Sequence, residues 1–140
     1  MKQKIIFTND IIHDVEAVLS TFQYDKIFVL MDSNTHRFCW DLLGESALLH
    51  DAQHINIEPV DSNKNLNTLS FIWEELSTKG ATRHSCLINL GGGMVTDIGG
   101  MASSTFKRGL KFINIPTTLL SMVDASVGGK TGINFNGVKN

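Results

Sequence analysis

Short apolar or β-branched runs alternate along this chain with longer segments of helical period, and this alternation limits its possible folds most strongly. The expected strands are residues 4–7, 26–31, 55–57, 86–90 and 112–115. Helical patterns follow a capping Asp10 and cover residues 65–77. The apolar positions of these helices are Ile11, Val15, Val18, Leu19 and Phe22, and Leu66, Leu69, Ile72, Trp73 and Leu76. The sequence therefore predicts an α/β fold, a Rossmann-like and mostly parallel sheet with flanking helices.

The composition is that of an ordinary globular chain and excludes several classes of protein. The 140 residues, 42% of them hydrophobic, suffice for one core and predict a single domain over residues 1–140. The net charge of −2, without a block of like charges, gives no electrostatic footprint for nucleic acid or an anionic membrane. No apolar stretch is long enough for a membrane span. Cys39 and Cys86 fit no metal-ligand spacing, so we expect two buried thiols in a cytoplasmic protein.

Four polar clusters each follow a predicted strand. They occupy residues 32–34, 59–64, 91–97 and 116–118. In open α/β sheets, ligands bind beyond the carboxyl ends of the strands. The sequence therefore predicts one ligand site that is built from several loops at the same end of the sheet.

The glycine run at 91–93 is the clearest of these clusters. Three glycines let a backbone pass close to a ligand, and a helix beginning near Met94 would direct unpaired N–H groups at an anion such as a pyrophosphate. The spacing departs from the Rossmann fingerprint, because the third glycine position holds Thr96. A plain strand-to-helix turn with Asp97 as the first-turn dipole partner is the alternative interpretation. The small residues that follow cost helix propensity, which close approach of a chain segment or a flat ligand would justify.

The remaining charged and polar residues each have an ordinary structural interpretation. Residues 128–131 lack the first glycine of a P-loop, since that position holds Asp124, and they present a single lysine, Lys130. Arg108 can be a cation at a helix C-terminus, with Gly109 as its left-handed cap. Residues 117–118 can cap a helix after a proline. No nucleophile elbow is present.

The five histidines give no zincin pattern. His50 and His54 are four residues apart, but the segment between them leads into a predicted strand, and no matching carboxylate and histidine follow. His13, His36 and His84 are isolated and are interpreted as surface residues.

Taken together, the motifs resemble those of the 3-dehydroquinate synthase family. The match consists of GGGMVTD, KRG, INIPTTLLSMVDASVGGKTGIN and GVKN, in this order over residues 91–140. A weaker match extends through residues 32–34 and 58–64. The resemblance implies an N-terminal NAD-binding domain here and a separate, mostly helical domain that carries a zinc or cobalt site. The family's metal ligands, a glutamate and two histidines, are expected beyond Asn140, so no metal ligand is assigned to this chain. The resemblance also implies a homodimer.

The resemblance assigns roles to individual residues. The positions that match the family's NAD site are Asp32, Asn34, Asp61, Lys64, Gly92, Gly93, Met94, Asp97, Thr117, Thr118, Lys130 and Lys139. The positions that match its site for a phosphorylated sugar-acid substrate are Arg108, Asp124, Lys130 and Asn140. A departure is visible at Val60 and Asp61, where the family usually has glycine and glutamate.

The implied reaction is the cyclisation of 3-deoxy-D-arabino-heptulosonate 7-phosphate to 3-dehydroquinate and phosphate in aromatic amino acid biosynthesis. NAD supplies the transient oxidation of a secondary alcohol, and zinc polarises that alcohol. The alternatives are a related sugar-phosphate cyclase, a metal-dependent polyol dehydrogenase, or a non-catalytic dinucleotide-binding fragment. The 140-residue chain alone is expected to show no turnover.

Overall fold

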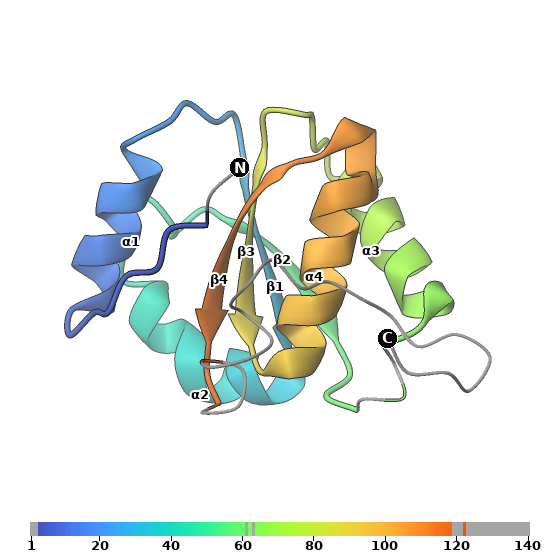
Figure 1. Cartoon of the computed structure of the whole chain (residues 1–140), viewed down its shortest axis with the longest axis horizontal. Coiled ribbons are helices and arrows are strands. Elements are labelled where there is room, and N and C mark those ends of the chain that lie inside the picture. Colours follow the sequence, from blue (N-terminus) through green and yellow to red (C-terminus); the bar gives the residue numbers. More distant parts are fainter. Residues whose placement is uncertain (1–2, 61, 63, 119–121, 123–140) are drawn as a thin grey trace.

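Four parallel strands form one sheet in the order β2-β1-β3-β4, flanked by helices (Figure 1). The computed structural model describes residues 3–60, 62, 64–118 and 122. The strands are β1 (Ile27–Asp32), β2 (Gln53–Ile57), β3 (Cys86–Gly91) and β4 (Lys111–Pro116). The helices are α1 (Ile11–Leu19), α2 (Ser33–Leu43), α3 (Leu66–Thr78) and α4 (Gly93–Thr105), followed by the 3₁₀ turn η2 (Phe106–Arg108). The expected α/β class with a parallel sheet is confirmed.

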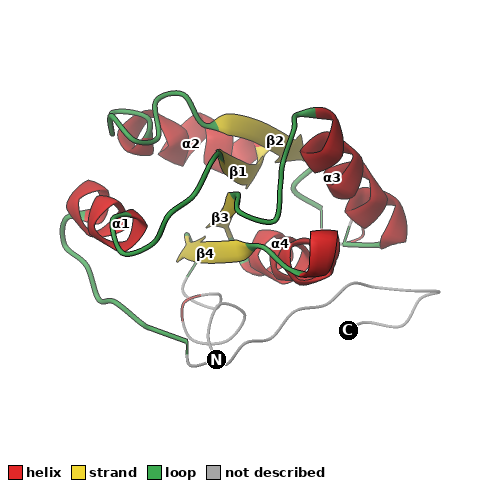
Figure 2. Ribbon diagram, turned by 90° about the horizontal axis from the view of Figure 1, so that it is seen from above, coloured by secondary structure: helices red, strands yellow, loops and turns green. Residues whose placement is uncertain are grey.

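The sheet separates two apolar layers. Figure 2 shows α1 and α2 on one face of the sheet and α3 and α4 on the other. Alternate residues of β1 serve the two layers, so that Phe28 and Leu30 pack towards α3 and α4 while Val29 and Met31 pack towards α1 and α2. Every residue of β1 and of β3 is buried, as expected for central parallel strands covered on both faces.

Two of the helix starts agree with the sequence analysis. The Asp10 side chain accepts a hydrogen bond from the backbone N–H of His13, and the Asn65 side chain accepts one from that of Thr68. Each bond satisfies one of the N–H groups that a helix leaves unpaired in its first turn. Of the expected apolar face of α3, Leu66 is exposed, whereas Leu69, Ile72 and Leu76 are buried.

The strand expected at residues 4–7 is absent. These residues lie in a loop, and the Phe7 side chain is 96% exposed. Strand-forming residues alone do not make a strand, because a strand also needs a neighbouring edge to pair with. No described strand pairs with residues 4–7, although β2 and β4 are the edge strands of the sheet.

Helix α2 was not expected, and α4 ends differently from the prediction. Arg108 and Gly109 were expected to form the end of α4, but that helix ends at Thr105. Lys107 and Arg108 take positive φ angles of 44° and 68°, so the left-handed conformation does not fall on Gly109 alone. The buried side chains of Phe106 and Leu110 anchor the chain on either side of these residues, which forces the reversal between them.

Candidate functional site

The two central strands, β1 and β3, end beside each other, and the chain leaves them towards opposite faces. After β1 it enters α2 and returns through β2, and after β3 it enters α4 and returns through β4. This divergence is a topological switch point, where open α/β sheets form a ligand-binding crevice. The described parts of all four predicted polar clusters lie at this carboxyl end of the sheet.

Asp32 ends β1 and also caps α2. Its Oδ1 accepts a hydrogen bond from the backbone N–H of Thr35 at 2.8 Å. In return, the backbone N–H of Asp32 donates to Thr35 Oγ1 at 3.1 Å, which completes a capping box. Asp32 is buried, and its Oδ2 has no hydrogen-bond partner among the described residues. Asn34, which the resemblance also assigns to the NAD site, is exposed in the first turn of α2.

The glycine turn at the end of β3 leads into α4 without a side-chain cap. Gly92 occupies the N-cap position, and no side-chain hydrogen bond closes the first turn. Each of α1, α2 and α3 has such a bond, so α4 is the exception among the α-helices described. A Cβ at Gly91 would lie 2.7 Å from the Cβ of Val95, which shows why this position needs glycine. The turn thus presents open N–H groups at the positive end of a helix dipole.

The segment that follows β4, Thr117 and Thr118, forms a wall beside this turn. The backbone N–H of Thr117 donates to the carbonyl oxygen of Gly91 at 3.0 Å. A Cβ at Gly92 would lie 3.2 Å from Cγ2 of Thr118. The structure therefore brings both threonines against the glycine turn. The alternative role of these threonines as a helix cap involves residues 119–121, which lie outside the described residues.

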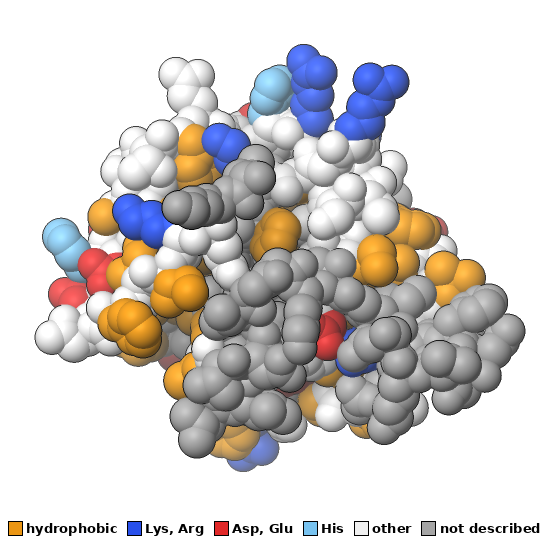
Figure 3. Space-filling view, in the orientation of Figure 1, with side chains coloured by type: hydrophobic (Ala, Val, Ile, Leu, Met, Phe, Trp, Pro, Cys, Tyr) orange, Lys and Arg blue, Asp and Glu red, His pale blue; other side chains and the backbone are white. Residues whose placement is uncertain are grey.

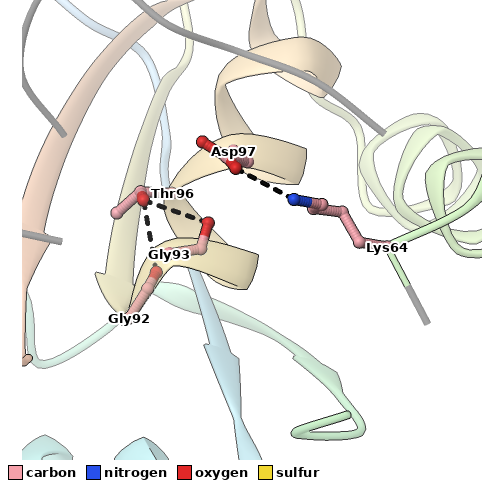
Figure 4. A network of polar contacts seen from close by, with 5 residues as sticks. All are labelled: Lys64, Gly92, Gly93, Thr96 and Asp97. Carbon is pink, nitrogen blue, oxygen red and sulfur yellow. Dashed lines mark hydrogen bonds and ion pairs between the residues drawn. The ribbon is translucent and has the colours of Figure 1, made fainter. Parts of the chain in front are cut away.

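Lys64 and Asp97 form a buried ion pair beside the turn (Figure 4). Lys64 precedes α3, whereas Asp97 lies in the second turn of α4. Lys64 Nζ is 3.1 Å from Asp97 Oδ2, and the side chains are only 7% and 12% exposed. The interpretation of Asp97 as a first-turn dipole partner is wrong, because the first turn of α4 contains no acidic residue. The pair instead ties the segment after β2 to α4.

Two other residues of the motif serve α4 itself. Thr96 Oγ1 donates to the carbonyl oxygens of Gly92 and Gly93, at 3.2 and 3.3 Å (Figure 4). Thr96 is fully buried, so its hydroxyl satisfies the helix rather than facing a ligand. The Met94 side chain packs partly buried against the core that α3 and α4 share.

Arg108 is not brought together with the other predicted site residues. It lies between α4 and β4, at the amino end of the sheet, whereas the glycine turn lies at the carboxyl end. There it lines an open depression of about 490 Å³ with Thr82, Arg83, His84 and Lys107. Figure 3 shows Lys, Arg and His side chains gathered at this end of the molecule. The 13 residues of α4 correspond to about 20 Å between the two ends.

Five residues with predicted roles lie outside the described part of the chain. They are Asp61, Asp124, Lys130, Lys139 and Asn140. Their roles stay predictions.

The sequence analysis did not identify the polar pair beneath the site, Asn89 and Asn114. Asn89 is a buried polar residue in an otherwise apolar strand, and its side chain contacts Asn114 on the neighbouring strand. An asparagine within a run of Leu and Ile was the signal available in the sequence.

The cysteines and histidines differ in how deeply they are buried. Burial raises the pKa of the Cys86 thiol to about 12, so it stays neutral, as expected for a structural thiol. Cys39 is also a free thiol, but it is half-buried, so the expectation of two buried thiols holds for Cys86 alone. His50 is exposed, whereas the His54 ring packs against Trp40 and His36. Burial, followed by the charges of His36 and Lys79, lowers the pKa of His54.

Within residues 3–60, 62, 64–118 and 122, no cluster of three His, Cys, Asp or Glu side chains could hold a metal ion. In the same residues, no helix is both long and apolar enough to cross a membrane.

A parallel α/β sheet with a glycine turn and an uncapped helix at its switch point is the arrangement of a dinucleotide-binding fold. The sequence model of the family described as 3-dehydroquinate synthase N-terminal matches residues 54–140. This chain therefore belongs to the 3-dehydroquinate synthase family.

The sequences of individual relatives align with nearly the whole chain. The 3-dehydroquinate synthase of Parabacteroides distasonis is 50% identical over 139 residues, which are 99% of this chain and 39% of that protein. The enzyme of Pelagibacter ubique is 39% identical over 141 residues, covering 97% of this chain and 38% of that protein. The chain thus spans about two fifths of the length of these relatives.

A solved structure shows the same fold. It is 2-epi-5-epi-valiolone synthase from Streptomyces hygroscopicus, with NAD+ and Zn2+ bound. It is 26% identical, with a TM-score of 0.76, over 96% of this chain and 39% of that one.

Proposed function

We propose that this chain is the NAD-binding domain, over residues 1–140, of a 3-dehydroquinate synthase. Such an enzyme converts 3-deoxy-D-arabino-heptulosonate 7-phosphate to 3-dehydroquinate and phosphate. Membership of the family supports the reaction, and the open N-terminus of α4 at the switch point is the observation that carries the cofactor proposal.

The residues present fit the cofactor. The free N–H groups of α4 suit the diphosphate, because they combine unpaired donors with the positive end of the helix dipole. The backbone can approach closely at Gly92, and Thr118 stands opposite. One carboxylate oxygen of Asp32, beside the turn, has no hydrogen-bond partner among the described residues, which suits the hydroxyls of a ribose.

NAD, when bound, supplies the transient oxidation of the substrate alcohol. In this proposal, residues of this chain bind the cofactor and the substrate and orient them. The ion pair of Asp97 and Lys64 holds the segment after β2 against α4, and Thr117 lies against the glycine turn. Lys130 and Asn140 contact the substrate phosphate, and Asp124 a substrate hydroxyl. A divalent metal, zinc or cobalt, is proposed for the complete enzyme, with ligands that this chain does not supply.

The position of Arg108 bears on the assembly. Substrate bound at the carboxyl end of the sheet would be about 20 Å from Arg108 of the same chain, judged from the length of α4. A substrate contact by Arg108 would therefore have to come from a second copy. We accordingly propose a homodimer for the complete enzyme.

A chimera tests the reaction most directly. The 139 aligned residues of the Parabacteroides distasonis enzyme are replaced by this chain, and dehydroquinate and phosphate are measured with added NAD and zinc. We expect the chimera to form both products, and the isolated 140-residue chain to bind NAD without turnover. A folded chimera that binds NAD but releases no phosphate from the heptulosonate phosphate would contradict the proposal.

A related sugar-phosphate cyclase is the second candidate, favoured by the likeness to 2-epi-5-epi-valiolone synthase. Turnover of another phosphorylated sugar, together with inactivity towards the heptulosonate phosphate, would identify that case.

A further inference from the structure

Asn89 is a fully buried asparagine in β3, directly beneath the glycine turn. Its Nδ2 donates to Asn114 Oδ1 on β4 at 3.0 Å. Its Oδ1 has no hydrogen-bond partner among the described residues. An unsatisfied buried polar atom destabilises the folded state, so the position calls for a reason other than stability.

The unpaired oxygen lies against Gly99 in the middle of α4. A Cβ at Gly99 would be 2.0 Å from Asn89 Oδ1 and 2.4 Å from its Cγ. Helix α4 therefore reaches this depth on the sheet only because Gly99 has no side chain. Oδ1 lies on the side of Gly99 from which a Cα–H bond projects, as in weak Cα–H···O contacts. The close approach that was expected to justify the small residues of α4 is thus made by Asn89.

The other end of the same side chain fixes β4. Asn89 and Asn114 are register partners, and two residues further along Gly91 pairs with Pro116. The next residue, Thr117, donates its N–H to Gly91. The hydrogen bond between Asn89 and Asn114 thus holds β4 just before the wall of Thr117 and Thr118 begins.

We propose that Asn89 is a positioning residue for the cofactor cleft. Its Oδ1 sets how closely α4 packs on the sheet, and its Nδ2 fixes the end of β4 through Asn114. Together they set the separation between the open turn at Gly92 and the wall at Thr117 and Thr118. The role in cofactor binding rests on the proposed function, whereas the effect on the wall does not.

The test replaces the partner of Asn89 and reads both effects. Asn114→Leu removes the acceptor at similar size, and Asn114→Asp retains it. Thr105→Val is the matched control, because it removes a side-chain hydrogen bond with Trp73 at the far end of α4. The measurements are hydrogen exchange at the Thr117 amide and NAD affinity by calorimetry.

We expect Asn114→Leu to accelerate exchange at Thr117 at least tenfold and to weaken NAD binding at least fivefold. Asn114→Asp should keep the exchange rate and the NAD affinity close to those of the unaltered chain, and Thr105→Val should change neither quantity. Unchanged exchange in Asn114→Leu, or faster exchange with unchanged NAD affinity, would overturn the proposal. If the unaltered chain binds no NAD, the proposed function fails, and the exchange data alone decide whether Asn89 positions the wall.

A second variant covers the case in which Asn114→Leu does not fold. In Asn89→Ala combined with Gly99→Ala, the new methyl occupies part of the space that the amide leaves. We expect this double variant to fold, with the same fast exchange at Thr117. Slow exchange there would count against the proposal.

Discussion

Helices α2 and α4 begin at the same switch point, from neighbouring parallel strands, yet their first turns are completed in opposite ways. The first turn of α2 is closed by the capping box of Asp32 and Thr35. The first turn of α4 begins at Gly92 and has no side-chain cap. One helix start has a side-chain partner, whereas the other has none among the described residues, which suits the proposed binding of a diphosphate.

The difference separates structural from functional use of the same geometry. A helix N-terminus attracts an anion wherever it occurs, and a capping carboxylate uses that attraction internally. At α4 the capping position holds a glycine, so no side chain at this position competes with a ligand for the N–H groups of the first turn. The predictions below alter one side of this comparison at a time.

The largest effect is expected from Asp97→Ala, on the α4 side. Removing Asp97 takes away a buried, charged hydrogen-bond partner of the Lys64 ammonium, which should lower the free energy of unfolding by about 1.5–3 kcal/mol. Urea unfolding measures the change. The matched control is Glu75→Ala, which breaks the more exposed Glu75–Lys79 pair and should cost about 0.5 kcal/mol or less. Equal losses in the two variants would show that the buried pair has no special weight.

On the α2 side, Asp32→Ala removes the cap and should cost about 1–2 kcal/mol. Asp32→Asn retains an oxygen acceptor and should retain most of that stability, while losing the charge offered to a ribose. Thermal unfolding and NAD calorimetry on both variants separate the two roles. A loss of stability in Asp32→Asn as large as in Asp32→Ala would contradict the capping role.

Closing α4 artificially makes it resemble α2. In Gly92→Ser a hydroxyl can cap the first turn, and we expect NAD affinity to fall about tenfold, or about 1.4 kcal/mol. Gly92→Ala adds the same Cβ near Thr118 without the hydroxyl. The difference between the two affinities, measured by calorimetry, isolates self-capping. If serine and alanine weaken binding equally, steric crowding rather than an open helix end explains the need for glycine.

The smallest effect on stability is expected from a change of pH, and it should arise on the α2 side of the comparison. The folded-state pKa of His54 is lowered, first by burial and then by the charges of His36 and Lys79. The unfolded state therefore binds a proton more readily, so stability is complete above pH 6.5 and declines as the pH falls below it. Urea unfolding at pH 7.5 and pH 5.5 should show this loss. His54→Phe keeps a ring beside Trp40 and should reduce the dependence on pH, and an unchanged dependence would assign it to another group.

The sequence predicted the features that depend on local patterns. The cap at Asp10 was found because a capping side chain precedes an apolar helical period, and the period alone placed the start of α3 near Asn65. Helix α2 was missed because its outer surface carries Phe38 and Leu42, which are 72% and 55% exposed and obscure the period. The D-x-x-T spacing of Asp32 and Thr35 was the signal that was overlooked.

Tertiary packing decided the rest. The Lys64–Asp97 pair joins residues 33 positions apart, and no local pattern announces it. The positive φ angles of Lys107 and Arg108 follow from the burial of residues on either side. Arg108 lies at the far end of α4 because it follows that helix and precedes the parallel strand β4, so the order of elements already separates it from the glycine turn.

Titration of NAD into the isotope-labelled 140-residue chain, followed by NMR of the backbone amides, tests the central claim most directly. We predict the largest shifts at Gly92, Gly93 and Met94, and little change at Ile11 and Ile12, where Asp10 caps α1. Shifts that are absent from the start of α4, or that instead gather at the basic depression around Arg108, would contradict the account.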